Sequence, residues 1–183
     1  MNIIKTKLDG LLIIEPKVFG DERGFFYETY HEQRYKNAGI KESFVQDNRS
    51  RSTGNVLRGL HFQKRKPQGK LVTVTAGTVF DVAVDLREDS PTFGQYESII
   101  LSGDNRLQFY IPPGFAHGFC VLSDIADFQY KCTDFYDPTD EGGIIWNDNS
   151  ININWPISEP NLSLKDKELP SLEDVRKQLK FGK

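Results

Sequence analysis

Two segments, VLRGLHFQ at residues 56–63 and QGKLV at residues 68–72, combine strand-forming residues with isolated polar side chains. Aliphatic and aromatic residues bounded by turn residues favour short β-strands. His61 lies in the first segment, in an otherwise apolar run, and Lys70 lies in the second. If the two strands fold over each other, His61 and Lys70 lie side by side. This region therefore predicts both β-structure and a polar site within it.

The chain after residue 70 continues as short strands separated by turns. Residues 79–86 alternate, with Phe80, Val82, Val84 and Leu86 on one face and Asp81, Ala83 and Asp85 on the other. We expect further strands at 96–101, 107–111, 116–122 and 127–133, and we expect the last two to pair as a hairpin. Strands spaced by roughly 8–12 residues indicate an all-β sandwich or barrel.

The N-terminal region adds strands and a helix. Residues 11–15 predict a strand that Pro16 ends, residues 19–24 a turn, and residues 25–30 a second strand. Residues 44–50 begin as a strand and are expected to run into a loop. Residues 31–38, followed by Gly39, predict a short helix that begins at an exposed His31, and Ser171 is expected to cap a C-terminal helix.

Composition limits the class of protein. The 183 residues suffice for a sizeable core, and we expect residues 1–183 to form one domain. The formal net charge of −3, without a strongly basic half, argues against a nucleic-acid partner. No run approaches the roughly 18 apolar residues of a membrane helix, and the N-terminal residues do not resemble a secretory signal. We therefore expect a cytoplasmic protein with no membrane partner, whose Cys120 and Cys132 are buried, reduced thiols.

His61 is a candidate general base, because a neutral imidazole with a pKa of about 6.5 accepts a proton at neutral pH. A structural histidine is the competing interpretation of the residue type alone. Strand alternation places Arg58 and His61 on opposite faces, so a shared site requires a bulge. Gly59, which lies between them, is where we expect it.

His117 follows a PPG turn at residues 112–114, and this segment resembles the second histidine motif of the cupin jelly rolls. In metal-binding cupins the first motif supplies His-x-His, whereas the corresponding place here reads His61-Phe62-Gln63. A closed metal site needs three or four N, O or S ligands. We therefore expect no bound metal, and a metal-dependent cupin oxygenase or isomerase is an alternative.

Other polar residues each admit a structural and a functional interpretation. Tyr130 is either a core aromatic or a phenol that faces a cavity opposite the base and donates a proton. Asp166 is either a surface charge or the acceptor that fixes the tautomer of the histidine. Five polar residues lie near the ends of predicted strands. Each one alone can be interpreted as a solvated side chain, but together they can bind a phosphorylated ligand: Arg23, Glu28, Gln46, Asn48 and Arg58.

Taken together, the motifs closely resemble the dTDP-4-dehydrorhamnose 3,5-epimerase family. The resemblance extends over residues 6–166, and any one motif is weak while the ordered set is highly specific. The motifs are DERGFFYE (21–28), FVQDN (44–48), VLRGLHFQ (56–63), QGKLV (68–72), FDVAVD (80–85), SPTFG (90–94), IPPGFAHGF (111–119) and LKD (164–166).

The resemblance implies a cupin-like jelly-roll β-barrel with short flanking helices, acting as a homodimer without metal or cofactor. The implied substrate is dTDP-4-dehydro-6-deoxy-D-glucose, inverted at C3 and C5 through an enolate on the route to dTDP-L-rhamnose. The family's base falls on His61, its partner carboxylate on Asp166, its acid on Tyr130, and the lysine beside the keto oxygen on Lys70.

The same resemblance implies a set of contacts to the nucleotide sugar, some of which serve the neighbouring subunit because the N-terminal strand of this family reaches towards the partner. These contacts fall on Arg23, Glu28, Gln46, Asp47, Asn48, Arg58, Lys70, His117, Glu141 and Lys165.

Two further alternatives remain. A relative that epimerises only one carbon, or acts on another nucleotide sugar, would use the same proton-transfer residues. A non-catalytic sugar-nucleotide-binding cupin would not require His61, Lys70, Tyr130 and Asp166 together.

Overall fold

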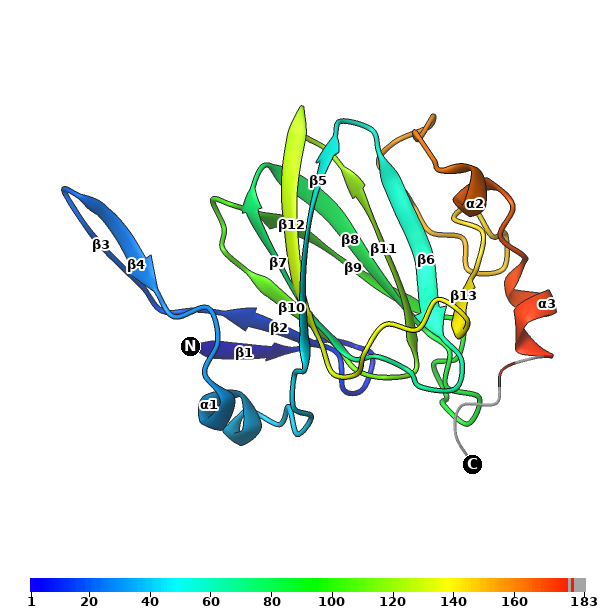
Figure 1. Cartoon of the computed structure of the whole chain (residues 1–183), viewed down its shortest axis with the longest axis horizontal. Helices are drawn as coiled ribbons and strands as arrows, with labels where there is room; N and C mark the ends of the chain where they lie inside the picture. The colour runs from blue at the N-terminus through cyan, green and yellow to red at the C-terminus, as the bar shows by residue number, and fades with distance from the viewer. Residues whose placement is uncertain (178, 180–183) are drawn as a thin grey trace.

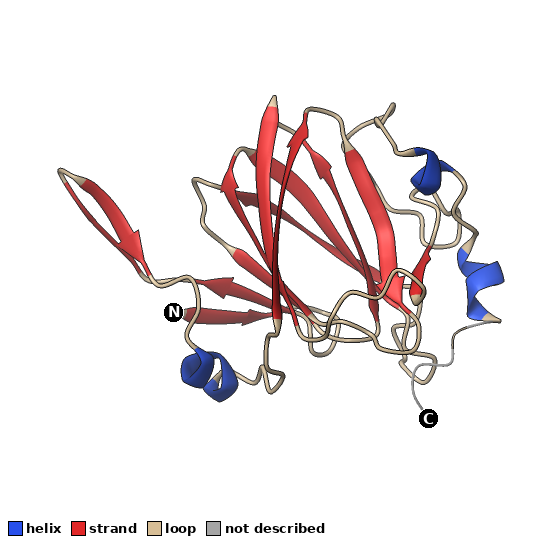
Figure 2. Ribbon diagram, in the orientation of Figure 1, coloured by secondary structure: helices blue, strands red, loops and turns tan. Residues whose placement is uncertain are grey.

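The computed structural model of this chain describes residues 1–177 and 179, which form two facing antiparallel sheets and a separate hairpin (Figure 1). In this part of the chain, the first sheet contains, in spatial order, β1 (Asn2–Lys5), β2 (Leu12–Glu15), β10 (Gln108–Ile111), β7 (Lys70–Ala76), β12 (Ile125–Cys132) and β5 (Gln46–Thr53). The second contains β13 (Glu141–Gly143), β6 (Leu57–Gln63), β11 (Phe115–Val121), β8 (Thr78–Asp85) and β9 (Tyr96–Ser102). The expected all-β architecture is confirmed, and the helices of the described residues lie at the periphery (Figure 2).

The buried apolar residues form three clusters: one between the sheets, one outside the second sheet, and one in which Tyr35 of the N-terminal helix packs with strands of the first sheet. Val72 and Phe109 from the first sheet pack with Ala83 from β8 in the inner layer. Val82 and Val84 face outward, where they pack with Leu172 of the C-terminal segment. The alternation expected along β8 is therefore confirmed. Each face of this strand is covered, and Asp81 is left buried on the inner side.

The described helices are short and lie outside the two sheets. The two expected helices are confirmed as α1 (Glu32–Asn37), followed by Gly39 at φ +101°, and α3 (Leu172–Arg176), whose N-cap Ser171 accepts a hydrogen bond from the backbone of Asp174. The sequence did not predict α2 (Leu164–Lys167), a single turn that holds Asp166 against the second sheet.

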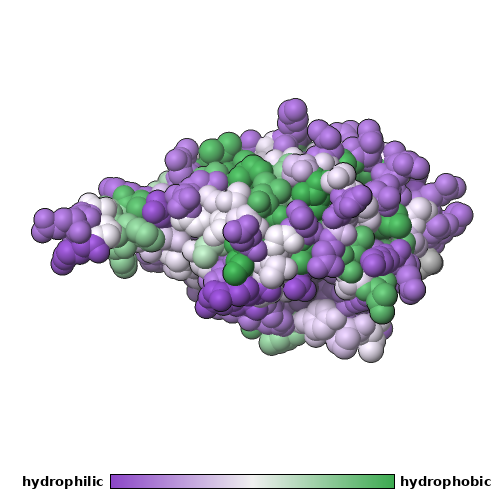
Figure 3. All heavy atoms as spheres, turned by 90° about the horizontal axis from the view of Figure 1, so that it is seen from above, coloured by the Kyte–Doolittle hydropathy of each residue, from purple (hydrophilic) through white to green (hydrophobic). Residues whose placement is uncertain are grey.

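A hairpin of β3 (Val18–Asp21) and β4 (Gly24–Tyr27) projects away from both sheets (Figure 1). The expected turn over 19–24 was therefore too long, since the first half of that range pairs with β4. Phe25 and Phe26 are 59% and 70% exposed on the hairpin. In the space-filling view the hairpin forms a narrow arm with a hydrophilic tip and hydrophobic side chains behind it (Figure 3).

The expected hairpin between β11 and β12 is wrong. β11 pairs with β6 and β8 in one sheet, whereas β12 pairs with β5 and β7 in the other. The three-residue connection 122–124 crosses between the sheets because both sides of β11 are already occupied. The expectation that residues 44–50 run into a loop is also wrong: β5 continues to Thr53, because its polar residues pair with β12 along the whole strand.

A bulge in β6 changes which side chains face the inside of the barrel. His117 pairs with His61, but Phe119 pairs with Arg58, so three steps along β6 match two along β11. This extra residue confirms the bulge expected at Gly59, which has φ +119°. A Cβ atom at this position would lie 2.7 Å from the carbonyl oxygen of His117 and from the Cα of Gly118. The backbone of β11 thus leaves room for glycine alone.

We expect Gly59→Ala to lower the free energy of unfolding by about 3 kcal/mol or more, because backbone strain and a clash with β11 add together. Gly39→Ala is the matched control, since Gly39 also has a positive φ but no atom would lie within 4 Å of its Cβ. Its expected cost is about 1–2 kcal/mol. Denaturant unfolding of both variants measures the difference, and equal costs would contradict a steric role for the approach of β11.

Candidate active site

The polar residues predicted from the sequence surround a space between the two sheets. Two adjoining cavities of about 310 and 450 Å³ share His61 from β6, Lys70 from β7 and Tyr130 from β12. His61 belongs to one sheet, whereas Lys70 and Tyr130 belong to the other. The cavities are large enough for a small-molecule ligand, and they place the imidazole on the wall opposite the ammonium and the phenol.

His61 is held by a carboxylate from far along the chain. Its Nε2 lies 2.6 Å from Oδ1 of Asp166, which is almost fully buried on α2. Burial raises the pKa of Asp166, but the hydrogen bonds from His61 and Ser163 and the charges of His61 and Lys165 outweigh burial and lower it overall. An ionised carboxylate only accepts hydrogen bonds, so Nε2 carries a proton and Nδ1 remains as the basic nitrogen.

A second histidine–aspartate pair lies beside the first. His117 is the cross-strand partner of His61, and its Nε2 lies 3.0 and 3.1 Å from the two carboxyl oxygens of Asp81. Burial lowers the pKa of His117, and the charges of Lys70 and His61 act in the same direction, although Asp81 opposes them. His117 therefore tends towards the neutral form, which suits a hydrogen-bonding group better than a cation.

Lys70 is the basic side chain at the centre of the two cavities. Among residues 1–177 and 179, no acceptor receives a hydrogen bond from its amino group, which lies 5.8 Å from the ring centroid of Tyr130. Burial lowers the pKa of Lys70, while Cys132, Asp81 and Glu141 raise it. An ammonium group in this position can stabilise a negative charge that develops on a ligand.

Tyr130 remains protonated in the cavity. Burial raises the pKa of its phenol, Cys132 and Glu141 raise it further, and Arg58 opposes them. A phenol that keeps its proton at neutral pH can act as an acid towards a carbanion placed against it.

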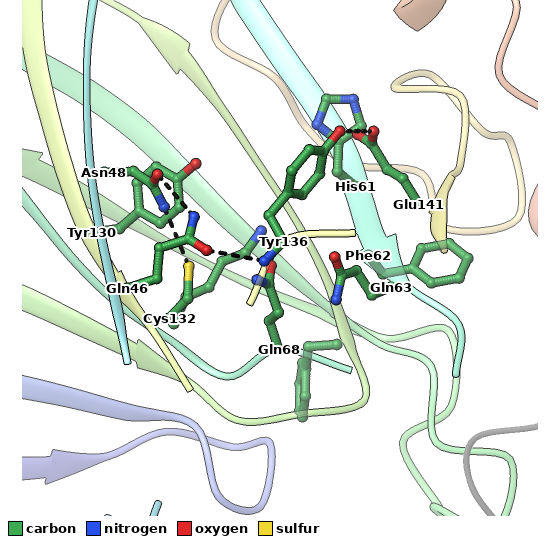
Figure 4. A pocket seen from close by; sticks show the side chains of 12 residues that line it. Gln46, Asn48, His61, Phe62, Gln63, Gln68, Tyr130, Cys132, Tyr136 and Glu141 are labelled. Atoms are coloured by element: carbon green, nitrogen blue, oxygen red, sulfur yellow. Dashed lines mark hydrogen bonds between the residues drawn. The ribbon is translucent and has the colours of Figure 1, made fainter. Parts of the chain in front are cut away.

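The outer part of the first cavity carries amides, an aromatic ring and a carboxylate (Figure 4). Gln46 donates to Asn48 and accepts from the backbone of Tyr136, and the Tyr136 phenol donates to Glu141 at 2.6 Å. That bond raises the pKa of Tyr136 to about 12. Lys165 also binds Glu141, at 2.5 Å. This end can therefore offer amide hydrogen bonds and an exposed aromatic face to one ligand.

Most of the predicted site residues come together here. Gln46, Asn48, His61, Lys70, Tyr130 and Glu141 line the first cavity, and Arg58, His117, Lys165 and Asp166 join His61, Lys70 and Tyr130 in the second.

Three predicted residues lie elsewhere. Asp47 points to the opposite face of β5 and pairs with Lys131, because neighbouring strand residues alternate. Arg23 lies at the tip of the projecting hairpin and pairs with Asp21. Glu28 follows β4 and pairs with Arg34. One chain does not bring these side chains into its own cavity.

The sequence interpretation missed several lining residues. Tyr136 lies in the irregular stretch after β12, where no periodicity marks it. Cys132 could have been found, because it lies two residues after Tyr130 and faces the same side of β12. Both cysteines are free and buried, as expected.

Gln63 stands where metal-binding cupins have a second histidine, and its side chain here forms hydrogen bonds to the backbone. Its amide donates to the carbonyl oxygens of Lys66 and Phe135 and accepts from the backbone of Asp137. In the described part of the chain, no three His, Cys, Asp or Glu side chains come close enough to hold a metal ion. Nor does any described helix have the length and apolar character needed to cross a membrane.

Comparison with known proteins gives consistent matches. A family model described as dTDP-4-dehydrorhamnose 3,5-epimerase matches residues 5–174. The dTDP-4-dehydrorhamnose 3,5-epimerase of Salmonella typhimurium is 56% identical over 178 residues, which are 96% of this chain and 97% of that protein.

Solved structures agree in fold. The crystal structure of the dTDP-6-deoxy-D-glucose-3,5-epimerase of Legionella pneumophila, in complex with dTDP-4-keto-L-rhamnose, matches with a TM-score of 0.96 and 55% identity, over 100% of this chain and 98% of that one. A 3'-monoepimerase of Streptomyces bikiniensis, in complex with dTDP-quinovose, matches with a TM-score of 0.88 and 29% identity, over 94% of this chain and 89% of that one. The expected cupin-like jelly roll is thereby confirmed.

Proposed function

We propose, since this chain belongs to the dTDP-4-dehydrorhamnose 3,5-epimerase family, that His61, Tyr130 and Lys70 carry out the proton transfers of its reaction. The enzyme is an isomerase that converts dTDP-4-dehydro-6-deoxy-D-glucose into dTDP-4-dehydro-L-rhamnose by inverting C3 and C5. The observation that carries the assignment of roles is the placement of His61, bonded to Asp166, across one cavity from Lys70 and Tyr130.

The substrate chemistry explains why these three groups are needed. The C3 and C5 protons flank the C4 carbonyl and are acidified by it. His61 removes a proton through Nδ1, and Asp166 stabilises the imidazolium that forms. Lys70 donates to the C4 oxygen as it becomes an enolate. Tyr130, on the other wall, returns a proton from the opposite face, which inverts the carbon.

Cations and amides along the cavity suit the nucleotide part of the substrate. Arg58 and Lys165 line the second cavity and match the charge of a diphosphate. Gln46 and Asn48 can hydrogen-bond to a base or sugar edge, and the half-exposed ring of Tyr136 can stack on a base. His117 is a neutral hydrogen-bonding group for a sugar hydroxyl.

A homodimer explains the location of the hairpin. Arg23 and Glu28 lie outside the cavity of their own chain, on or just after an arm with exposed phenylalanines (Figure 1). Burial of these rings against a second copy would stabilise the pair of chains. We place Arg23 and Glu28 at the cavity of the partner chain.

The cytoplasm is the compartment that we infer for the enzyme. Two buried, unpaired thiols suit a reducing environment.

His61→Ala should be the most damaging single substitution, with a loss of about 10²–10⁴-fold in kcat, followed by Lys70→Ala with about 10²–10³-fold. His31→Ala is the matched control, because His31 is exposed at the start of α1, and it should retain native turnover. The assay follows the keto sugar in heavy water and counts deuterium at C3 and C5. Near-native turnover by His61→Ala would refute the assignment of the base, and deuterium at one carbon only would identify a single-carbon epimerase.

Tyr130→Phe should abolish product formation but retain part of the solvent exchange of the substrate protons. The base still forms the enolate, whereas the acid on the opposite face is missing. Proton exchange and product are both measured by NMR in heavy water. If exchange at C3 and C5 also stops, Tyr130 acts earlier or supports the structure instead.

Mixing two inactive variants tests the exchange of arms. His61→Ala chains keep an intact arm, whereas Arg23→Ala/Glu28→Ala chains keep an intact base. After refolding together, a mixed dimer should regain one working site, because the second chain receives the arm of the first. Replacing the first chain by an Arg23→Ala/Glu28→Ala/His61→Ala chain is the control. No recovery of activity, or a monomer by sedimentation, would rule out exchange.

A further inference from the structure

Gln108 carries a buried amide that has no role in the chemistry proposed for the cavity. It is the first residue of β10 in the first sheet and is 2% exposed. Its side chain lies on the outer face of this sheet, because its neighbour Phe109 packs between the sheets. A buried amide is costly unless hydrogen bonds compensate it. The partners of Gln108 therefore show which part of the chain it holds.

Those partners belong to the root of the arm, where the hairpin of β3 and β4 joins the barrel. Nε2 of Gln108 donates to the carbonyl oxygen of Thr29 at 2.7 Å, and Oε1 accepts from the hydroxyl of Tyr35 at 2.6 Å. A backbone carbonyl only accepts hydrogen bonds, so the amide nitrogen faces Thr29 and the amide oxygen faces the phenol. Tyr35, on α1, is also 2% exposed. Buried groups thus fix the residue that directly follows Glu28.

A second contact to the arm comes from the turn just before β10. The guanidinium carbon of Arg106 lies 4.1 Å from the ring centroid of Phe25 on β4, an arrangement in which cation and ring attract each other. The same guanidinium donates to the carbonyl oxygen of Asp104 at 3.0 Å, which holds the side chain against its own turn. Because Arg106 and Gln108 are two residues apart, one short stretch of the barrel holds the arm at its middle and at its root.

Two points of attachment restrict the direction in which the arm projects. A single contact would leave the hairpin free to swing about it, whereas contacts at Phe25 and Thr29 oppose that rotation. Arg23 lies five residues before Glu28, about 15 Å away along an extended strand. A small change of angle at the root is therefore amplified at the tip. Neither Arg106 nor Gln108 lines the two cavities of the candidate site, so their influence on the reaction passes through the arm.

We propose that Gln108 and Arg106 are positioning residues, which set the direction of the arm before two chains meet and thereby place Arg23 and Glu28 for the partner chain. This inference rests on the proposed exchange of arms. An arm that already has its bound orientation loses less conformational freedom when it docks. The two residues therefore affect how tightly the partner's cavity binds the nucleotide sugar, whereas the proton-transfer groups of that cavity are unchanged.

Gln108→Met tests the inference in the homodimer, because it keeps the length of the side chain and removes both hydrogen bonds. We expect KM to rise by about tenfold or more, since two buried hydrogen bonds are lost, while kcat changes by less than about threefold. Steady-state kinetics with the keto-sugar nucleotide measure both constants. A fall in kcat with an unchanged KM would overturn the inference.

Mixed dimers separate the arm from the rest of the chain. A His61→Ala chain supplies the arm and an Arg23→Ala/Glu28→Ala chain supplies the base, so turnover reports the mixed dimer alone. Gln108→Met in the first chain should raise KM by about tenfold or more, as in the homodimer. In the second chain it should change KM by less than about twofold, because the arm of that chain is already inactive. Each mixture carries the substitution once, so lost stability alone would act equally in both.

The outcomes distinguish this inference from the function on which it rests. Equal effects of Gln108→Met in the two chains would overturn the inference while arm exchange stands. No activity in the parent mixture, without Gln108→Met, would instead refute arm exchange and the inference with it.

Arg106→Ala covers the case in which Gln108→Met does not fold, because Arg106 lies in a turn outside the strands. In the arm-supplying chain it should raise KM by about threefold, the worth of an exposed cation–π contact. In the base-supplying chain it should leave KM unchanged. An unchanged KM in both mixtures, or an equal rise in both, would overturn the inference.

Discussion

Strand alternation separates Arg58 from His61, yet the cavity needs both side chains. The extra residue in β6 removes this conflict, and the step is possible because Gly59 allows the backbone of β11 to pass within contact distance. His61 is thereby placed opposite His117, and both imidazoles face the other sheet. The positions of His61 relative to Arg58 and to His117 follow from this single irregularity in the ladder.

The hydrogen-bond partners and the burial of the ionisable side chains in the site then determine which of them can accept or donate a proton. Two histidine–aspartate pairs and a lysine lie at or next to the cavities. One carboxylate bonds to the base and prepares it to take a proton. The other, deeper carboxylate bonds to His117, whose pKa is lowered by burial. The two pairs therefore differ in depth and in the tendency of the histidine to carry a proton.

The sequence was most informative where a repeat of two residues determines which face is buried. The faces of β8, the caps of α1 and α3, and the need for a bulge near Gly59 all follow from local rules. The crossing from β11 to β12 does not, because a three-residue connection fits a hairpin as well, and the choice depends on strands far along the chain. Asp166 belongs to a helix of one turn, which has almost no local signal. Arg23 and Glu28 lie outside the cavity of their own chain, so no pattern within that chain could locate their target.

The distance in sequence between His61 and Asp166 has a consequence for synthesis of the protein. These residues are 105 positions apart, and Asp166 comes from outside both sheets. On the ribosome, the strands that carry Lys70, His117 and Tyr130 are all complete before the turn with Asp166 is made. The imidazole therefore acquires its partner last, after the barrel has been translated. Substrate turnover therefore requires that the chain has been translated beyond residue 166.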